Sequence, residues 1–189
     1  MSSEIDICNN ALAVLGETLI ASLTEDNKAA RLCNLQYAPT RDTIFRSYPW
    51  HCLQKRALLA RSFTDPLWGY NYQYALPSDC LKVLELEEHN DNTTVEYSVE
   101  GRFILTDAET CTILYISRVT DPNEMDVMLR DVISSKMAAD MAYNLTGNPA
   151  MVEMTYKLYK VAMAQARSVD AQEGTPRLIV ENSWYDERE

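Results

Sequence analysis

The stretch DPNEMDVMLRDVISSKMAADMAYNLTGNP, residues 121–149, decides the fold class. In Asp121-Pro122, the Asp can cap a helix and the Pro suits the first helical position. Apolar residues then recur at helical steps, namely Met125, Leu129, Val132, Met137, Met141 and Leu145. Gly147 ends this helix, and Asn148-Pro149 starts another one at once. So short a break predicts a tight antiparallel helical hairpin.

The second helix of the hairpin is expected to run to about Gln172 and to end at Gly174. Its predicted inner face consists of five apolar residues, Met151, Met154, Leu158, Val161 and Ala162. After Gly174, Pro176 prevents the helix from continuing, so residues 174–189 are read as an extended tail.

The N-terminal end is also predicted to be helical. Apolar spacing indicates a first helix from about Ser3 to Leu15, with Gly16 in the left-handed position that often ends a helix. A second helix should start between residues 24 and 26 and end at Pro49. Because Pro39 lies inside it, we expect a kink near residue 38 or a break into two helices.

The middle of the chain has a period of two, which is typical of strands. Five strands are expected, near 70–75, 81–86, 95–99, 102–105 and 110–119, with a turn at Pro77. Residues 50–60 fit either a short helix or an extended arm. The predicted fold class is therefore α+β and mostly helical. Residues 1–60 and 121–173 form a helical bundle, and residues 61–120 form an inserted small antiparallel sheet or sandwich.

The composition is that of a globular protein with a formal net charge of −11. Such a charge disfavours a broad nucleic-acid-binding surface, and it is equally consistent with simple solubility. The five cysteines are scattered and include no CxxC pair, which indicates free thiols in a reducing compartment. Neither a signal peptide nor a membrane span is expected.

Patterns that carry chemistry are lacking. His51 and His89, the two histidines, are not at metal-ligand spacing, and the sequence has no GxGxxG or GxSxG motif. Cys52 follows His51 directly, and sequence neighbours meet poorly as a nucleophile–base pair. We therefore expect no catalytic residue, no metal and no cofactor, although a hydrolase centred on this pair stays open as an alternative.

An aromatic stripe, defined as Trp68, Tyr70, Tyr72 and Tyr74, alternates with small and polar residues. Alternation of this kind favours one face of a sheet core. The alternative is an exposed face that recognises a glycan or a peptide, which would make the protein a surface-binding module.

Four segments, in this order, resemble the head-to-tail adaptors of tailed phages, specifically the tail tubular protein A group of short-tailed phages. They are Cys8–Glu17 with its Leu-Gly pair, residues 29–50 ending in Arg-Ser-Tyr-Pro-Trp, residues 74–81 (YALPSDCL), and Ile116–Val119 leading into Asp121. Gly16, Pro49, Trp50, Pro77, Asp121 and Pro122 are the landmarks of this resemblance. It covers about residues 3–170.

The resemblance implies a non-enzymatic protein of the virion neck, made in the host cytoplasm. About twelve copies would form a ring below the portal protein and above a tail or nozzle protein, and double-stranded DNA would pass through the centre. The C-terminal tail of this chain, residues 174–189, carries apolar residues flanked by charge, namely Leu178, Ile179, Val180, Trp184 and Tyr185. We expect these to dock on the portal or on a neighbouring subunit.

Overall fold

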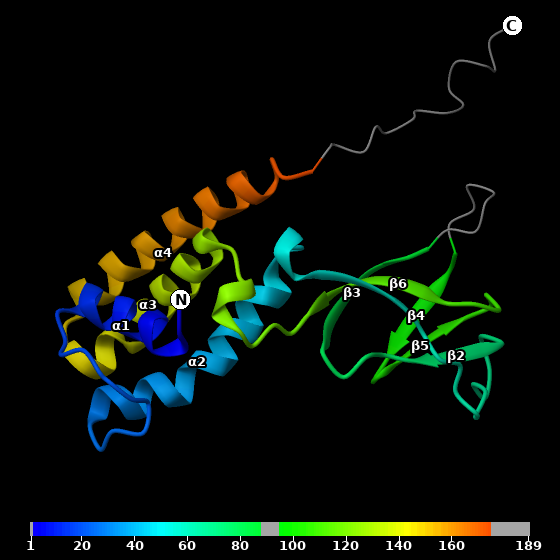
Figure 1. The fold of residues 1–189 in the computed structure, drawn as a ribbon, viewed down its shortest axis with the longest axis horizontal. Coiled ribbons are helices and arrows are strands. Elements are labelled where there is room, and N and C mark those ends of the chain that lie inside the picture. Colours follow the sequence, from blue (N-terminus) through cyan, green and yellow to red (C-terminus); the bar gives the residue numbers. More distant parts are fainter. Residues whose placement is uncertain (1, 88–94, 175–189) are drawn as a thin grey trace, which may run out of the picture.

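The computed structural model, which describes residues 2–87 and 95–174, confirms a mostly helical α+β fold (Figure 1). Four helices lie together on one side and the strands lie on the other. The helices are α1 (Glu4–Leu15), α2 (Lys28–Ser47), α3 (Val127–Thr146) and α4 (Pro149–Asp170). Two short 3₁₀ helices, η1 (His51–Leu53) and η2 (Pro122–Glu124), occupy the connections between the two sides.

The first two helices begin at side-chain caps. Ser3 and Asp6 form a capping box at α1, and Gly16 ends it with a φ of 72°. Helix α2 starts at Lys28, later than predicted, because the Asn27 side chain accepts a hydrogen bond from the Ala30 N–H. Pro39 lies inside α2, which continues past it, so the predicted possibility of two separate helices is wrong. Burial of α2 residues on both sides of Pro39 offsets the one lost backbone bond.

The helical hairpin forms as predicted, with Gly147 at a φ of 63° and Asn148 capping α4. Its start differs from the prediction. Asp121 and Pro122 begin η2, and α3 starts only at Val127, where Asp126 is the cap. The Asp-Pro signal therefore starts a single short turn, because a second capping residue follows five positions later.

The strands form two three-stranded antiparallel sheets, ordered β1-β6-β3 and β2-β5-β4. Their bounds are β1 (Gln54–Leu58), β2 (Tyr72–Ala75), β3 (Cys80–Leu86), β4 (Tyr97–Glu100), β5 (Phe103–Thr106) and β6 (Thr112–Ser117). Residues 50–60, left open by the sequence, form η1 and then β1. Strand β1 pairs along its length with β6, so strand structure starts inside the segment that the sequence assigned to the helical bundle.

Two buried clusters match the two sides of the molecule. The helical core includes the central helix α3, which is buried against α1, α2 and α4. A smaller cluster between the sheets includes Tyr74, Ile104 and Ile113. Strand β3 connects the two, because Leu81 and Leu84 fall outside its ladder register and pack against the helical core.

Candidate interaction surface

The five tail residues predicted to bind a partner, Leu178, Ile179, Val180, Trp184 and Tyr185, lie outside the described residues. The last described residue at that end is Gly174, which packs against the His51 ring. A Cβ at position 174 would come 3.2 Å from His51 Nε2. The end of the described chain is thus fixed beside η1, at the junction of the helical and strand sides.

His51 and Asp170 hold this junction together. Asp170 is buried at the end of α4, and its two carboxylate oxygens accept hydrogen bonds from the His51 backbone N–H and from Nδ1, each at 2.9 Å. The roles at Nδ1 depend on the tautomer; a protonated Nδ1 donates. Glu173 is nearby, and one potential ligand atom from each of these three residues lies within 4.8 Å of the others. Sequence analysis missed this contact because the partners are 119 positions apart.

Cys52 lies at the same junction and is partly buried. Burial raises the pKa of its thiol, and the charge of Asp126, among others, adds to this, while a backbone hydrogen bond at Asp126 opposes it. The thiol is therefore kept protonated, which is the opposite of what an activated nucleophile needs. The Nε2 atom of His51, the ring nitrogen that is not paired with Asp170, lies beside Gly174.

The aromatic stripe does not form one strand face. Strand β2 begins at Tyr72, and Trp68 lies before it in a loop with 86% of its surface exposed. Tyr74 is buried and donates its hydroxyl to the Ala108 carbonyl at 2.8 Å. The preferred prediction of a common core face is therefore wrong for Trp68. Gly69 has a φ of 90°, and this left-handed residue separates Trp68 from the strand. Phe63 and Leu67 in the same loop are fully exposed.

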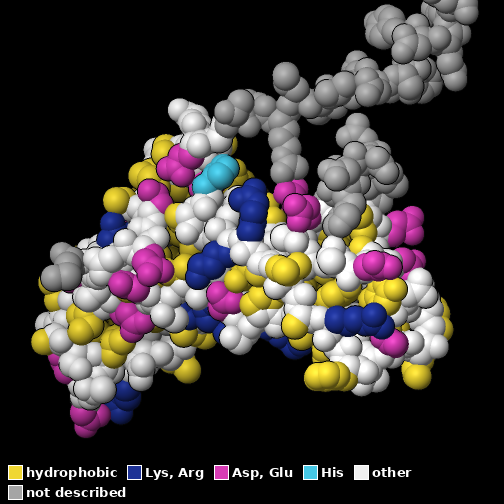
Figure 2. All heavy atoms as spheres, turned by 45° about the vertical axis from the view of Figure 1, so that its right-hand side comes forward, with side chains coloured by type: hydrophobic (Ala, Val, Ile, Leu, Met, Phe, Trp, Pro, Cys, Tyr) yellow, Lys and Arg dark blue, Asp and Glu magenta, His cyan; other side chains and the backbone are white. Residues whose placement is uncertain are grey.

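The predicted inner face of α4 is also wrong in part. Met154, Leu158 and Val161 are exposed by 46%, 47% and 55%. The side chains that α4 buries lie next to them around the helix, namely Thr155, Met163, Ala166 and Asp170. We call Met154, Leu158 and Val161 the outer stripe. In the space-filling view of Figure 2, hydrophobic side chains are likewise visible on the surface over both sides of the molecule.

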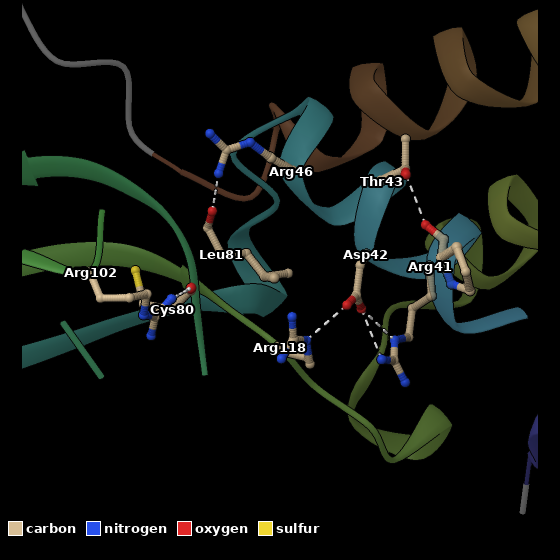
Figure 3. A network of polar contacts seen from close by, with 9 residues as sticks. Arg41, Asp42, Thr43, Arg46, Cys80, Leu81, Arg102 and Arg118 are labelled. Carbon is tan, nitrogen blue, oxygen red and sulfur yellow. Dashed lines mark hydrogen bonds and ion pairs between the residues drawn. The ribbon is translucent and has the colours of Figure 1, made fainter. Parts of the chain in front are cut away.

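Asp42 joins the helical side to the end of β6 (Figure 3). Its Oδ1 accepts hydrogen bonds from buried Arg41 at 2.9 and 2.8 Å, and its Oδ2 accepts one from Arg118 at 2.8 Å. Arg41 and Arg118 are far apart in the sequence, so this network also required the tertiary structure. Its position ties α2 to the segment that leaves the sheet.

Three of the landmark residues, Pro49, Trp50 and Pro77, lie where the chain changes direction. Trp50 is buried after α2 and donates its Nε1–H to the Ile44 carbonyl at 3.0 Å. Pro49 precedes it and its carbonyl accepts a bond from Gln54. The Pro77 carbonyl accepts bonds from the Cys80 N–H and from Arg102 in the turn before β3. All of them support chain turns or junctions.

The fold and these surfaces define a class: a mostly helical α+β protein that leaves apolar side chains uncovered on its outermost helix and on a loop of its strand side. No known family model matches the chain, and no curated protein matches it either. Across residues 2–87 and 95–174, no helix has the length and apolar character needed to cross a bilayer.

Proposed function

We propose that the protein is a structural subunit of a ring that joins a phage capsid to its tail. The outer stripe of α4 is the observation that carries this proposal. A surface helix of a monomer needs an apolar arc of somewhat more than 100°. Successive residues of an α-helix are turned by about 100° around its axis. On this basis, the buried side chains of α4 and the outer stripe together cover about half of the helix circumference. The additional arc is apolar surface available to another protein.

A closed ring needs two different, complementary flanks on each subunit. Helix α4 lies on one side of α3 and α2 lies on the other, so their outer faces point in different directions (Figure 1). The α2 side has an exposed Leu35 and a cavity of about 420 Å³ beside it, next to Pro39 and Lys136. This flank thus offers an apolar contact.

The identity of the ring rests on the ordered resemblance of the four sequence segments to phage adaptors. From it come the copy number of about twelve, the portal and tail partners, the location in the virion neck and the passage of DNA. The acidic composition is compatible with a conduit along which DNA slides without tight binding.

The ring is tested by native mass measurement of the protein with and without the portal protein, followed by imaging for annular particles. Leu158→Glu should abolish rings, because it places a charge in the outer stripe. Ala164→Glu is the matched control, since it adds the same charge to an exposed position about 120° further round α4. Equal loss of assembly in both variants, or unimpaired rings with Leu158→Glu, would contradict the role of the stripe.

The C-terminal tail of the chain is tested separately by deleting residues 175–189. Circular dichroism should show that the truncated chain is still folded, and binding to the portal should be lost. Normal joining to the portal would refute docking through Leu178, Ile179, Val180, Trp184 and Tyr185. Tight, salt-sensitive binding of the isolated protein to duplex DNA would count against a non-adhesive conduit.

A further inference from the structure

A cavity of about 470 Å³ lies where the C-terminal end of α2 meets the turns around β3 and between β4 and β5. Three basic residues, Arg46, Lys82 and Arg102, contribute to its lining, and no acidic residue does. Leu76, Leu81, Val83 and Val99 also contribute to the lining. In a protein with 28 acidic and 17 basic residues, this is a local reversal of charge.

The three cations have unsatisfied charge. Arg46 and Arg102 are held by backbone carbonyls: Arg46 donates to Leu81, and Arg102 donates to Pro77 and, at 2.9 Å, to Cys80 (Figure 3). Lys82 is exposed. In the described part of the chain, none of the three forms an ion pair with a carboxylate. Neutral carbonyls orient the two guanidinium groups but leave their positive charge for an anionic group.

The pKa of the Cys80 thiol, in the cavity wall, is affected by the charges around the cavity. Burial raises the pKa of this thiol; the charge of Arg102 opposes that shift, the charge of the neighbouring Asp79 adds to it, and Arg46 makes a smaller opposing contribution. Both guanidinium charges therefore act on the same point of the wall. In Figure 2, several Lys and Arg side chains lie along the junction between the helical and strand sides. A ligand for such a cavity combines carboxylates with apolar side chains.

The chain carries a segment of this composition. Residues 175–189 contain two apolar groups, each followed directly by acid: Leu178-Ile179-Val180-Glu181 and Trp184-Tyr185-Asp186-Glu187. With Glu189, the segment has four acidic residues and two basic ones, Arg177 and Arg188. Charge and apolar character thus both complement the cavity.

The segment also starts close enough to reach the cavity. Gly174 packs on His51, and Arg46 precedes His51 by five residues, a chain distance of at most about 18 Å. The fifteen residues that follow Gly174 can span roughly 50 Å when extended. A short tether of this kind gives an effective concentration on the order of millimolar, which favours the segment of the same molecule over other carboxylates.

We propose that the C-terminal segment of the unassembled subunit docks in its own basic cavity, with its carboxylates on Arg46, Lys82 and Arg102. The same segment would then be withheld from a partner until the partner displaces it. Docking in the cavity does not depend on ring formation. Duplex DNA fits less well, because the chain as a whole carries a net charge of −11 and repels phosphate.

Carbodiimide cross-linking of the full chain tests the docking directly. An isopeptide bond should join Lys82 Nζ to Glu181, Asp186, Glu187 or Glu189, and its yield should fall at least about fivefold in about 1 M salt. In an equal mixture of ¹⁴N- and ¹⁵N-labelled chains, the linked peptides should carry a single label. Mixed labels would assign the cavity to the tail of a second copy, and absence of the link would overturn the proposal.

A second readout does not depend on cross-linking. In protein labelled with fluorotryptophan, the Trp184 ¹⁹F resonance should move toward its position in the denatured chain in Lys82→Glu and stay unchanged in Lys82→Arg. Lys157→Glu is the control, because it makes the same charge change on the exposed side of α4. An equal shift in the control, or none with Lys82→Glu, would overturn the proposal. Duplex DNA binding lost only in Lys82→Glu would assign the cavity to DNA instead.

Discussion

Asp170, the last residue of α4, receives two hydrogen bonds from His51, one from the backbone N–H and one at Nδ1, each 2.9 Å long. This pair fixes the end of the helical hairpin to the start of the strand side. It also determines where the chain beyond Gly174 leaves the described structure, since Gly174 packs on the same imidazole ring.

Asp170→Ala should lower the free energy of unfolding by about 1–3 kcal/mol, because the His51 N–H loses its acceptor at a partly buried position. Urea denaturation measures the change. Asp140→Ala is the control: its ion pair with Lys136 is within one helix and partly exposed, so a loss of less than about 1 kcal/mol is expected. Equal effects would show that the His51 contact adds no stability of its own.

Asp42→Ala should be more damaging than removal of an exposed acid. Arg41 has only 7% of its side chain exposed and would lose its carboxylate, while Arg118 would lose its connection to α2. Breaking a buried pair costs about 3–5 kcal/mol; because Asp42 itself is 27% exposed, about 2–4 kcal/mol is expected here. Asp65→Ala, which removes the exposed pair with Arg61, should cost less than about 1 kcal/mol in the same thermal or urea titration. A ranking in the opposite order would contradict the structural role of Asp42.

Stability should fall in alkali partly through Tyr115. Burial, with a smaller effect of Asp79, raises the pKa of Tyr115 to about 12, above the ordinary value near 10. The unfolded chain therefore releases this proton first, and folding loses stability as the pH rises from about 10 to about 12, by at most about 3 kcal/mol.

Tyr115→Phe removes this contribution, so its unfolding free energy should decline less than that of the parent between pH 10 and 12. At neutral pH the variant should be about 1 kcal/mol less stable, because the hydrogen bond to Asp79 at 3.2 Å is lost. Tyr143→Phe, at an exposed position, is the control and should follow the parent curve. A parallel decline in all three proteins would refute the assignment.

Trp68 and Tyr74 should behave in opposite ways, although both belong to one sequence pattern. Trp68→Ala should change stability by less than about 0.5 kcal/mol, because the side chain is exposed, whereas Tyr74→Ala should cost about 3–5 kcal/mol through loss of core packing. Chemical denaturation compares the two.

Titration of Trp68 fluorescence with candidate glycans and peptides tests the alternative function as a surface-binding module. A saturable change absent from Trp68→Ala would support that alternative over the adaptor.

Capping residues and the spacing of apolar residues were sufficient to predict the helical hairpin at Gly147 and Asn148, the end of α1 at Gly16, and a central strand region. These features depend on backbone preferences and capping residues within a few positions, and both can be read from the sequence alone. The same local signals misplaced the start of α3, because Asp121 and Asp126 are both competent caps and only packing chooses between them.

Tertiary structure decided which apolar side chains are covered. The pattern of α4 could not separate Met154 and Leu158 from Met163 and Ala166, since all are apolar or small at helical spacing and only the position of α3 buries the second pair. The same holds for the His51–Asp170 and Asp42–Arg118 contacts, whose partners are distant in sequence. Local conformation is set by short-range sterics and hydrogen bonds, whereas burial depends on which distant segments come together.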